Sequence, residues 1–417
     1  MSAAMNRFPY LRVGVAVLAA AGLAGCSPSG GRPTAETASS TPSTVAATTA
    51  TTATSAAGSA AEGGVTDVPW PQVGPGWVLA QWSASQDAGA TLYLVDPAAH
   101  RYAITTFEPG ANVELVDWSG DGSHALFAAA AVTPSSAISV DLHTGAQSTV
   151  ALSGFPRYTR PDGLALLVST HFNGSKPGTL KRVDLQGNPQ LTYPTEDLGG
   201  AGQFSGEYAA SPDGTQLVLG TANLGNELVP RTDNSLVVLG NDGTVIRRLA
   251  APMPEAMCAP VKWWTPQTLL AQCVAEKGSA NQLWEVPLDG GAPTALTAVN
   301  SARGDDPAFG GDLGDVDAWK LPSGVFLQSL GAGCDQFLSR LASDGHATRV
   351  KVPDVAAGAA VTGAANGHLV LRDQKNCRGT TSLVSFDPAR NTATVLLGPP
   401  VNGGSVSQSM LYPSADS

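Results

Sequence analysis

Four of the five cysteines in this chain lie in its C-terminal half, and their chemistry is the easiest to predict. An even number of thiols in an oxidising compartment is typical of disulfide bonds. Thiolates can also bind zinc, but these lack the C-x-x-C spacing and the neighbouring histidines that zinc sites use. We therefore predict two disulfide bonds rather than a metal site. The four residues are Cys258, Cys273, Cys334 and Cys377.

A second group of residues with chemical potential is the acidic stretch at residues 303–317. Carboxylates gathered on a loop could hold calcium, which prefers oxygen ligands. Their spacing does not match an EF-hand loop, however, and the alternative is an acidic loop that is simply solvated. We keep its aspartates as candidate ligand-binding residues and expect neither a metal ion nor a cofactor. They are Asp305, Asp306, Asp312, Asp315 and Asp317.

The remaining polar residues show no catalytic pattern. None of the six histidines has the i, i+4 or H-x-E spacing of a zinc site. The sequence contains no G-x-S-x-G nucleophile motif, and its many glycines lie where turns need them rather than in a phosphate-binding loop. The tryptophans that fall in or beside predicted strands favour packing, with a sugar-binding aromatic platform as the alternative. We therefore predict no catalytic residue.

Cys26 has a different chemistry because of the residues before it. Arg7 and Arg12 make the first residues positive, and residues 13–23 form an apolar stretch that is too short to span a membrane. The motif L-A-G-C, which ends at Cys26, resembles the cleavage box of bacterial lipoproteins, in which the cysteine thiol takes the lipid. The alternative is an ordinary signal peptide with a chance cysteine. We predict lipidation at Cys26, where each buried methylene contributes roughly 0.8 kcal/mol to membrane anchoring.

Composition divides the chain into three parts. We predict a lipoprotein signal peptide at residues 1–25, a disordered stalk rich in Ser, Thr, Ala and Pro at residues 26–64, and a folded domain at residues 65–417. The net charge of −11 disfavours nucleic acid and anionic lipid headgroups as partners. The expected location is therefore the outer side of the cell membrane, with the lipid anchor as the contact to that membrane.

A turn signature recurs seven times in the folded domain and indicates its architecture. Each copy joins two short apolar-alternating runs through Asp, Asn, Gly or Pro, the residues that tight hairpins select. Successive copies lie 43 to 58 residues apart, and a repeat of this length made only of strands is typical of propeller blades. The signature aspartates are Asp96, Asp141, Asp184, Asp242, Asp289, Asp344 and Asp387.

A second series of turns predicts how the ring closes. Each blade should hold strands A to D from the centre outwards, and the recurring signature marks the C–D turns. Only six A–B turns lie inside the chain. The seventh inner strand is supplied by residues 407–412, which would pair with a second strand at residues 77–82. We therefore predict an all-β, seven-bladed β-propeller whose first blade is completed by the C-terminal strand.

The turn S-P-D-G-T at residues 211–215 is similar to the repeat of TolB-like, WD-type propellers. Only this copy and R-P-D-G at residues 160–163 carry the Pro-Asp-Gly core. The resemblance implies a propeller of the cell envelope that binds protein partners. The additional domain of TolB is not recognisable here, so a role in the Tol complex is not implied. The Ala/Gly/Thr-rich composition with a long stalk looks like lipoproteins of actinobacteria.

The blade frame also predicts the disulfide pairs and the binding face. The A–B and C–D turns share one face of a propeller, here called the turn face. The longer B–C and D–A connections share the other, here called the loop face, where we place any site. Cys258 and Cys273 are nearly symmetric about one A–B turn, whereas Cys334 and Cys377 occupy B–C loops of adjacent blades. We predict the bonds Cys258–Cys273 and Cys334–Cys377.

These features favour a non-catalytic binding module for a protein or an envelope ligand. The alternative is a propeller enzyme, such as a hydrolase, lyase or quinoprotein dehydrogenase acting on envelope sugars or peptides. That alternative needs polar residues that converge at the axis, which a sequence does not show. A purely structural spacer within a complex is a third interpretation.

Overall fold

The computed structural model describes residues 61–413, apart from residues 132, 173–175, 197, 200, 223–234, 254–255, 276–280, 300, 302–312, 332–335, 356–357 and 374–380. The described residues belong to one compact unit, Ser59–Ser417. They form strands and two short 3-10 helices, η2 (Val65–Asp67) and η3 (Trp70–Gln72). None of the helices in this part of the chain has the length and apolar character needed to cross a membrane. The predicted signal peptide, Cys26 and the predicted stalk up to residue 60 lie outside the described residues.

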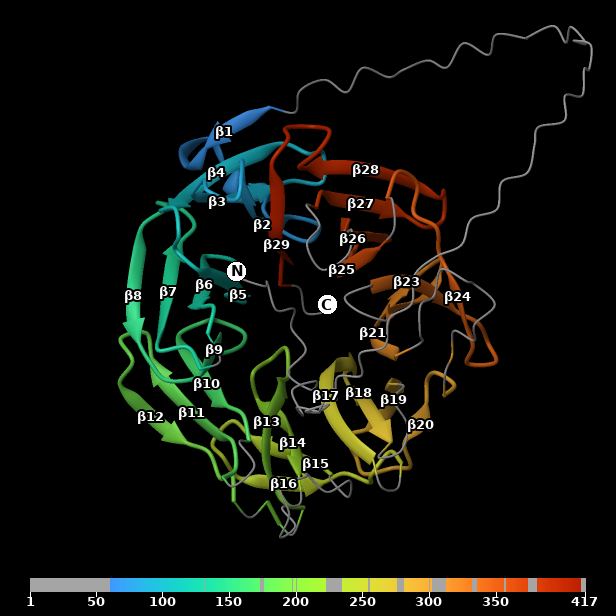
Figure 1. The fold of residues 1–417 in the computed structure, drawn as a ribbon. Coiled ribbons are helices and arrows are strands. Elements are labelled where there is room, and N and C mark those ends of the chain that lie inside the picture. The colour runs from blue at the N-terminus through green and yellow to red at the C-terminus, as the bar shows by residue number, and fades with distance from the viewer. Residues whose placement is uncertain are drawn as a thin grey trace, which may run out of the picture. The chain divides into compact units, whose positions relative to one another are not determined.

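The strands form antiparallel groups of four, arranged around a common centre (Figure 1). This confirms the predicted all-β propeller fold, and we interpret each group as a blade. Blade 1 contains β29 (Ser405–Leu411), β2 (Val78–Ser83), β3 (Ala90–Val95) and β4 (Arg101–Phe107). Blade 2 contains β5 (Val113–Trp118), β6 (His124–Ala129), β7 (Ser136–Asp141) and β8 (Gln147–Ala151). Blade 3 contains β9 (Phe155–Tyr158), β10 (Ala165–Thr170), β11 (Thr179–Asp184) and β12 (Pro189–Thr192).

The other strands of the described part follow the same order. Blades 4 and 5 contain β13 (Gln203–Ala210), β14 (Gln216–Ala222), β15 (Leu236–Gly240) and β16 (Val245–Arg248); and β17 (Ala256–Thr265), β18 (Thr268–Ala275), β19 (Asn281–Pro287) and β20 (Thr294–Ala295). Blades 6 and 7 contain β21 (Gly314–Leu321), β22 (Gly324–Leu330), β23 (Gln336–Leu341) and β24 (Ala347–Arg349); and β25 (Ala359–Ala365), β26 (His368–Asp373), β27 (Leu383–Asp387) and β28 (Thr392–Leu397). Blades 5 and 6 are joined into one sheet by a parallel pairing of Asn281 with Gly314.

The inner strands are β29, β5, β9, β13, β17, β21 and β25 (Figure 1). The second strand of each blade is a continuous apolar run because both of its faces are covered by neighbouring blades. Leu126, Leu166 and Leu219, for example, are at most 1% exposed. Packing between blades therefore provides the apolar core and holds the inner strands in place.

Local hydrogen bonds explain why the Asp-Gly turns form where the sequence predicts them. In the A–B turn of blade 4, Asp213 Oδ1 accepts from Ser211 Oγ at 2.6 Å and from the backbone N–H of Thr215 at 3.0 Å. Gly214 has a φ of +70°, and a Cβ there would lie 1.8 Å from the carbonyl oxygen of Arg160. Glycine is therefore required both for the left-handed turn and for the close approach of blade 3.

The C-terminal strand pairs with the first blade. Strand β29 is antiparallel to β2, with Leu411 opposite Val78 and Ser405 opposite Ser83. Tyr412 continues this contact, since its ring meets that of Trp118 in blade 2 at 5.2 Å. This pairing is the arrangement that the predicted closure requires, and a closed ring of seven blades stays a prediction.

The expected boundary between stalk and domain is wrong by three residues. Strand β1 (Glu62–Gly64), which the composition assigns to the stalk, pairs in parallel with β4 at the outer edge of blade 1. Glu62 forms an ion pair with the buried Arg101 at 3.2 Å and accepts a hydrogen bond from Tyr93 Oη at 2.9 Å. Composition missed this strand because backbone pairing and one ion pair hold it, rather than an apolar pattern.

Truncation of Leu411 tests the importance of the closing strand. Leu411 is 7% exposed and packs in a cluster with Val78, Val95 and Val370. Leu411→Ala is expected to lower the free energy of unfolding by about 2–4 kcal/mol, because it leaves a cavity between the two ends of the chain. Chemical denaturation measures this change. Leu164→Ala is the matched control, because Leu164 is 69% exposed, and equal effects of the two substitutions would contradict the packing role of β29.

Candidate functional site

The first predicted disulfide bond is confirmed. Cys258 lies in β17 directly opposite Cys273 in β18, and the two are joined with a Cα–Cα distance of 4.1 Å. Both side chains are at most 2% exposed. The bond therefore ties the first two strands of blade 5 together at the end that borders the loop face.

Several predicted site residues lie outside the part of the chain that the structure describes. For these, disulfide bonding and ligand binding stay predictions. They are Cys334, Cys377, Asp305, Asp306 and Asp312.

The prediction that Asp315 and Asp317 lie on an acidic loop is wrong, because both belong to strand β21. Asp315 is fully buried and accepts hydrogen bonds from the hydroxyls of Ser301 and Ser329. Asp317 forms an ion pair with Lys262 of blade 5 at 2.8 Å. Both carboxylates thus have partners within the protein. Asp315 connects β21 to Ser301 and Ser329, and Asp317 connects blade 6 to blade 5. The sequence did not show this because the partners come from distant residues.

A different group of polar residues meets on and beside the inner strands of blades 2, 3 and 4. We call it the inner-strand cluster. It extends from the A–B turn of blade 3 to the end of β10, which borders the loop face. Its members are Asp117, Arg157, Arg160, His171, Glu207 and Tyr208.

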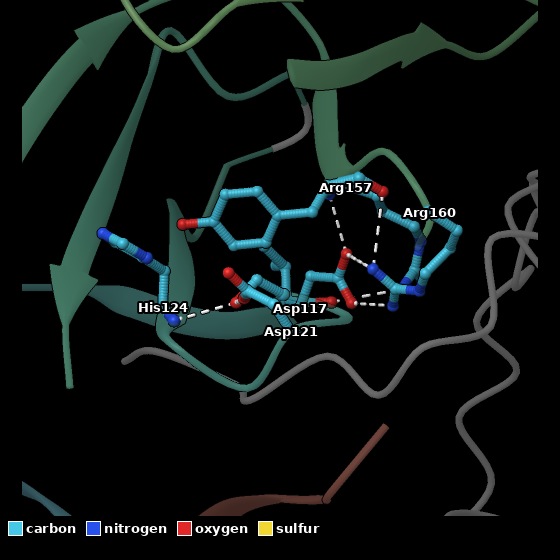
Figure 2. A network of polar contacts seen from close by, with 8 residues as sticks. Asp117, Asp121, His124, Arg157 and Arg160 are labelled. Atoms are coloured by element: carbon cyan, nitrogen blue, oxygen red, sulfur yellow. Dashed lines mark hydrogen bonds and ion pairs between the residues drawn. The ribbon is translucent and has the colours of Figure 1, made fainter. Parts of the chain in front are cut away.

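The part of the cluster near the turn face is an ion pair between blades 2 and 3 (Figure 2). Arg160 donates from Nη2 to Asp117 Oδ1 at 2.8 Å and from Nη1 to Asp117 Oδ2 at 3.3 Å. The same carboxylate accepts the backbone N–H of Tyr158 at 2.7 Å. Burial alone would lower the pKa of Arg160, but the charge and hydrogen bonds of Asp117 outweigh it and raise that pKa. This pair is therefore internally satisfied. It holds β9 of blade 3 against β5 of blade 2.

Arg160 occupies the position that serine holds in the related turns. Ser119 and Ser211 each donate their hydroxyl to the aspartate two residues later, at 2.6 Å in both blades. Arg160 instead points to the neighbouring blade, as the labelled side chains in Figure 2 show. The substitution converts a local turn contact into a contact between blades.

The part of the cluster near the loop face is built on a bulge in β13. Phe204 pairs with Thr221 and Tyr208 pairs with Leu219, so three residues of β13 oppose the single residue Gly220. The bulged residues are Ser205, Gly206 and Glu207. Bulges of this kind redirect side chains and are common beside functional sites.

Blade 3 holds the bulge in position. The backbone N–H of Phe172 donates to Ser205 O at 3.0 Å, and that of Gly178 donates to Phe204 O at 2.8 Å. Gly206 has a φ of +110°, and a Cβ there would lie 2.6 Å from His171 Cα. Only glycine therefore lets β13 approach His171 this closely.

The approach places the Glu207 carboxyl beside His171. Glu207 Oε1 lies 3.2 Å from His171 Nδ1, and the His171 ring packs against Phe155 at 4.7 Å. Burial raises the pKa of Glu207 from its ordinary value to about 7, although the positive charge of Arg157 opposes this shift. Burial also lowers the pKa of His171. Near pH 7 the Glu207 carboxyl is therefore present in both its protonated and its ionised form, whereas the neutral form of His171 is favoured.

Three polar atoms of β13 are buried without a hydrogen bond to any described residue, although one of them, Glu207 Oε1, has the 3.2 Å contact with His171 Nδ1. They are Gln203 Oε1, Glu207 Oε1 and Tyr208 Oη. Burial raises the pKa of Tyr208, and the charge of Arg157 acts on this hydroxyl as well as on Glu207. An unsatisfied buried polar group costs about 1–3 kcal/mol, so three of them on one strand need an explanation.

The cluster offers charge and hydrogen bonds rather than metal ligation. No group of three or more His, Cys, Asp or Glu side chains that could hold a metal ion occurs among the described residues. Arg157 is exposed on an inner strand, and its Nη1 donates to Val116 O at 3.1 Å. The arrangement can therefore contact a bound molecule with a cation, a carboxyl group that is partly protonated near pH 7, and a hydroxyl.

Two features of the sequence could have pointed to this cluster. Arg160 replaces the serine of the turn motif, and a glycine interrupts the inner strand of blade 4 before Glu207. Glycine within a strand often marks a bulge or a close backbone approach. The partners of these residues come from three blades, so spacing along the chain does not reveal the cluster.

Comparison with known proteins shows likeness of fold. No protein-family model and no characterised protein sequence matches the chain. One similar structure comes from a study of two prolyl endopeptidases, with 15% identity and a TM-score of 0.50 over 77% of this chain and 47% of that chain. This chain thus spans about half the length of that protein.

Two further similar structures come from named organisms. TolB from Acinetobacter baumannii has 14% identity and a TM-score of 0.43, over 81% of this chain and 67% of that chain. The β-propeller domain of the Trilobed protease from Pyrococcus furiosus has 13% identity and a TM-score of 0.48, over 75% and 91%. TolB is thus among the similar structures, and at these identities the likeness concerns the fold alone.

Stability as a function of pH tests the burial of Glu207. The folded protein raises the pKa of Glu207 to about 7, from an ordinary value of 4.5 in the unfolded chain. The folded state therefore binds the proton more tightly, and this contribution to stability is lost as the pH rises from 4.5 to 7. Glu207→Gln keeps a neutral side chain, so it should match the native chain at pH 4 and be more stable by roughly 1–3 kcal/mol at pH 8.

Chemical denaturation at several pH values measures the difference between the two proteins, in which the titration of other groups largely cancels. Glu196→Gln is the matched control, because Glu196 is exposed and its substitution should leave the pH dependence unchanged. A difference between the native chain and Glu207→Gln that is constant from pH 4 to pH 8 would show that Glu207 is not buried as described.

Proposed function

We propose that this chain is a lipid-anchored propeller on the outer side of a cell membrane that binds a protein or an envelope ligand without catalysing a reaction. The observation that carries the binding role is the set of three unsatisfied polar atoms on β13. These atoms lie on an inner strand in a rigid sheet, at a bulge that blade 3 holds in place. A bound molecule that supplies their missing hydrogen bonds would recover the free energy lost by burying them.

The anchoring part of the proposal rests on the sequence around Cys26 and on the place where the chain enters the domain. Strand β1 runs parallel to β4, and Glu62 is opposite Arg101, the first residue of β4 after a C–D turn. The chain therefore joins the propeller at the turn-face edge of blade 1. His171 and Glu207 lie towards the opposite, loop-face ends of the blades.

One observation favours the enzyme alternative. Glu207 and His171 are within 3.2 Å of each other, and a carboxyl group with a pKa of about 7 is suited to general acid–base catalysis. Burial and a neighbouring histidine are equally consistent with binding, and a bound molecule would supply hydrogen bonds to the unsatisfied atoms of Gln203 and Tyr208 in either case. Chemical conversion of a bound molecule by the native chain and not by Glu207→Gln would favour the enzyme.

Fractionation followed by capture tests the proposed function. The native chain should partition with membranes, and Cys26→Ala should move to the soluble fraction because the acyl chains are lost. This soluble form, immobilised and exposed to envelope extract, should retain a component of that extract. The component should be lost when Glu207→Ala and Tyr208→Phe are added to the soluble form, which gives the β13 variant.

The matched control for capture is Leu164→Ala, which alters an exposed side chain on the turn face. It should retain the same component as the soluble form. The anchor is refuted if Cys26→Ala stays with the membrane as the native chain does. The binding site is refuted if the β13 variant retains every component that the control retains.

A further inference from the structure

The inner-strand cluster has a local charge that differs from that of the whole chain. The chain carries a formal net charge of −11, but the charges near the β13 bulge do not follow it. Asp117, the other carboxyl group of the cluster, is paired with Arg160 in two hydrogen bonds. Among the described residues Arg157 forms no ion pair, and its side chain is exposed. Below about pH 7 the uncompensated charge of the cluster is therefore positive.

The groups around Arg157 can act as hydrogen-bond donors. The protonated carboxyl of Glu207 has one O–H to donate, and the Tyr208 hydroxyl has another. Both lie near enough to Arg157 for its charge to affect their pKa values. Neither Glu207 Oε1 nor Tyr208 Oη has a hydrogen bond to a described residue. A guanidinium with two neighbouring O–H donors is complementary to an acceptor that carries negative charge.

We propose that the inner-strand cluster binds a carboxylate group of its ligand, with Arg157 pairing to the carboxylate and Glu207 and Tyr208 donating hydrogen bonds to it. This assignment rests on the proposed binding function and specifies the chemistry that the site recognises. Arginine suits this task because its planar guanidinium matches a carboxylate in a bidentate contact. A cationic ligand would instead meet the positive charge of Arg157.

Proton linkage follows from the role of Glu207. The groups that face Glu207 are Arg157 from β9 and His171 from the end of β10, with Tyr208 next to it in β13 and the Asp117–Arg160 pair beyond. Burial lowers the pKa of His171 from its ordinary value, which favours the neutral ring near pH 7. Glu207 is then the group that changes charge near pH 7. Its ionisation places a negative charge beside the bound carboxylate and weakens binding.

Carboxylate probes with neutral counterparts test this assignment on the full chain. N-acetylglycine represents a peptide carboxylate, glucuronate represents a sugar carboxylate, and N-acetylglycinamide and glucose are the uncharged counterparts. Calorimetry or NMR titration should detect binding of at least one carboxylate and weaker binding of its neutral counterpart. The probe that binds more tightly identifies the source of the carboxylate as peptide or sugar.

Substitutions and changes of pH should alter the affinity for the carboxylate probe by the following amounts. Arg157→Gln should weaken binding of the carboxylate about tenfold or more, whereas Arg247→Gln, on the exposed strand β16, should not change it. Affinity of the native chain should fall about tenfold between pH 6 and pH 8, and Glu207→Gln should remove this pH dependence. Glu196→Gln should retain it. Melting temperatures of all variants establish that they are folded.

Three outcomes would overturn the assignment. The first is equal binding of the carboxylates and their neutral counterparts, and the second is unchanged affinity in a folded Arg157→Gln variant. The third is a combination of results. The soluble form captures an envelope component and the β13 variant does not, but no carboxylate probe binds to the native chain. That result would refute carboxylate recognition and leave the proposed binding function standing. Carboxylate binding by the native chain that Arg157→Gln abolishes would support the assignment.

Discussion

The bulge at Ser205–Gly206–Glu207 is the constraint on which the functional interpretation depends. A regular strand would place these residues in the ladder with β14, and Glu207 would not meet blade 3. The missing side chain of Gly206 lets the backbone lie against His171, and two hydrogen bonds from blade 3 hold it there. The consequence is a carboxyl group that is largely removed from water, beside a histidine and near an arginine. Its raised pKa and its unsatisfied oxygen both follow from this placement.

The rest of the propeller keeps this placement rigid. The ion pair of Asp117 with Arg160 fixes blade 2 against blade 3, and the contact of Gly214 with the Arg160 carbonyl brings blade 4 against blade 3. Pairing of β29 with β2 connects the two ends of the chain, so the blades cannot separate at that point without breaking a sheet. Within this frame the described residues leave three polar atoms of β13 without a hydrogen bond, which is why we propose a ligand as their partner.

The sequence predicted more of the fold than of the site. The Asp-Gly turns, the strand order and the Cys258–Cys273 bond depend on local residue types and on symmetry about a hairpin, which a sequence displays directly. Strand β1 escaped prediction because backbone pairing and Glu62 hold it to Arg101. Asp315 was assigned to a loop because its buried partners, Ser301 and Ser329, are 14 residues away on either side. The inner-strand cluster was missed for the same reason, since its members come from three blades and one of them depends on a bulge.

The most direct measurement for the central claim is the titration of the Glu207 carboxyl carbon by NMR in the full chain, with Glu207→Gln used to assign the resonance. The structure predicts a midpoint of about pH 7. It also predicts that Gly206→Ala, which would drive the bulge away from His171, returns the midpoint towards 4.5. A midpoint near 4.5 in the native chain would contradict the account, because the carboxyl would then be exposed to water and its oxygen would not need a ligand.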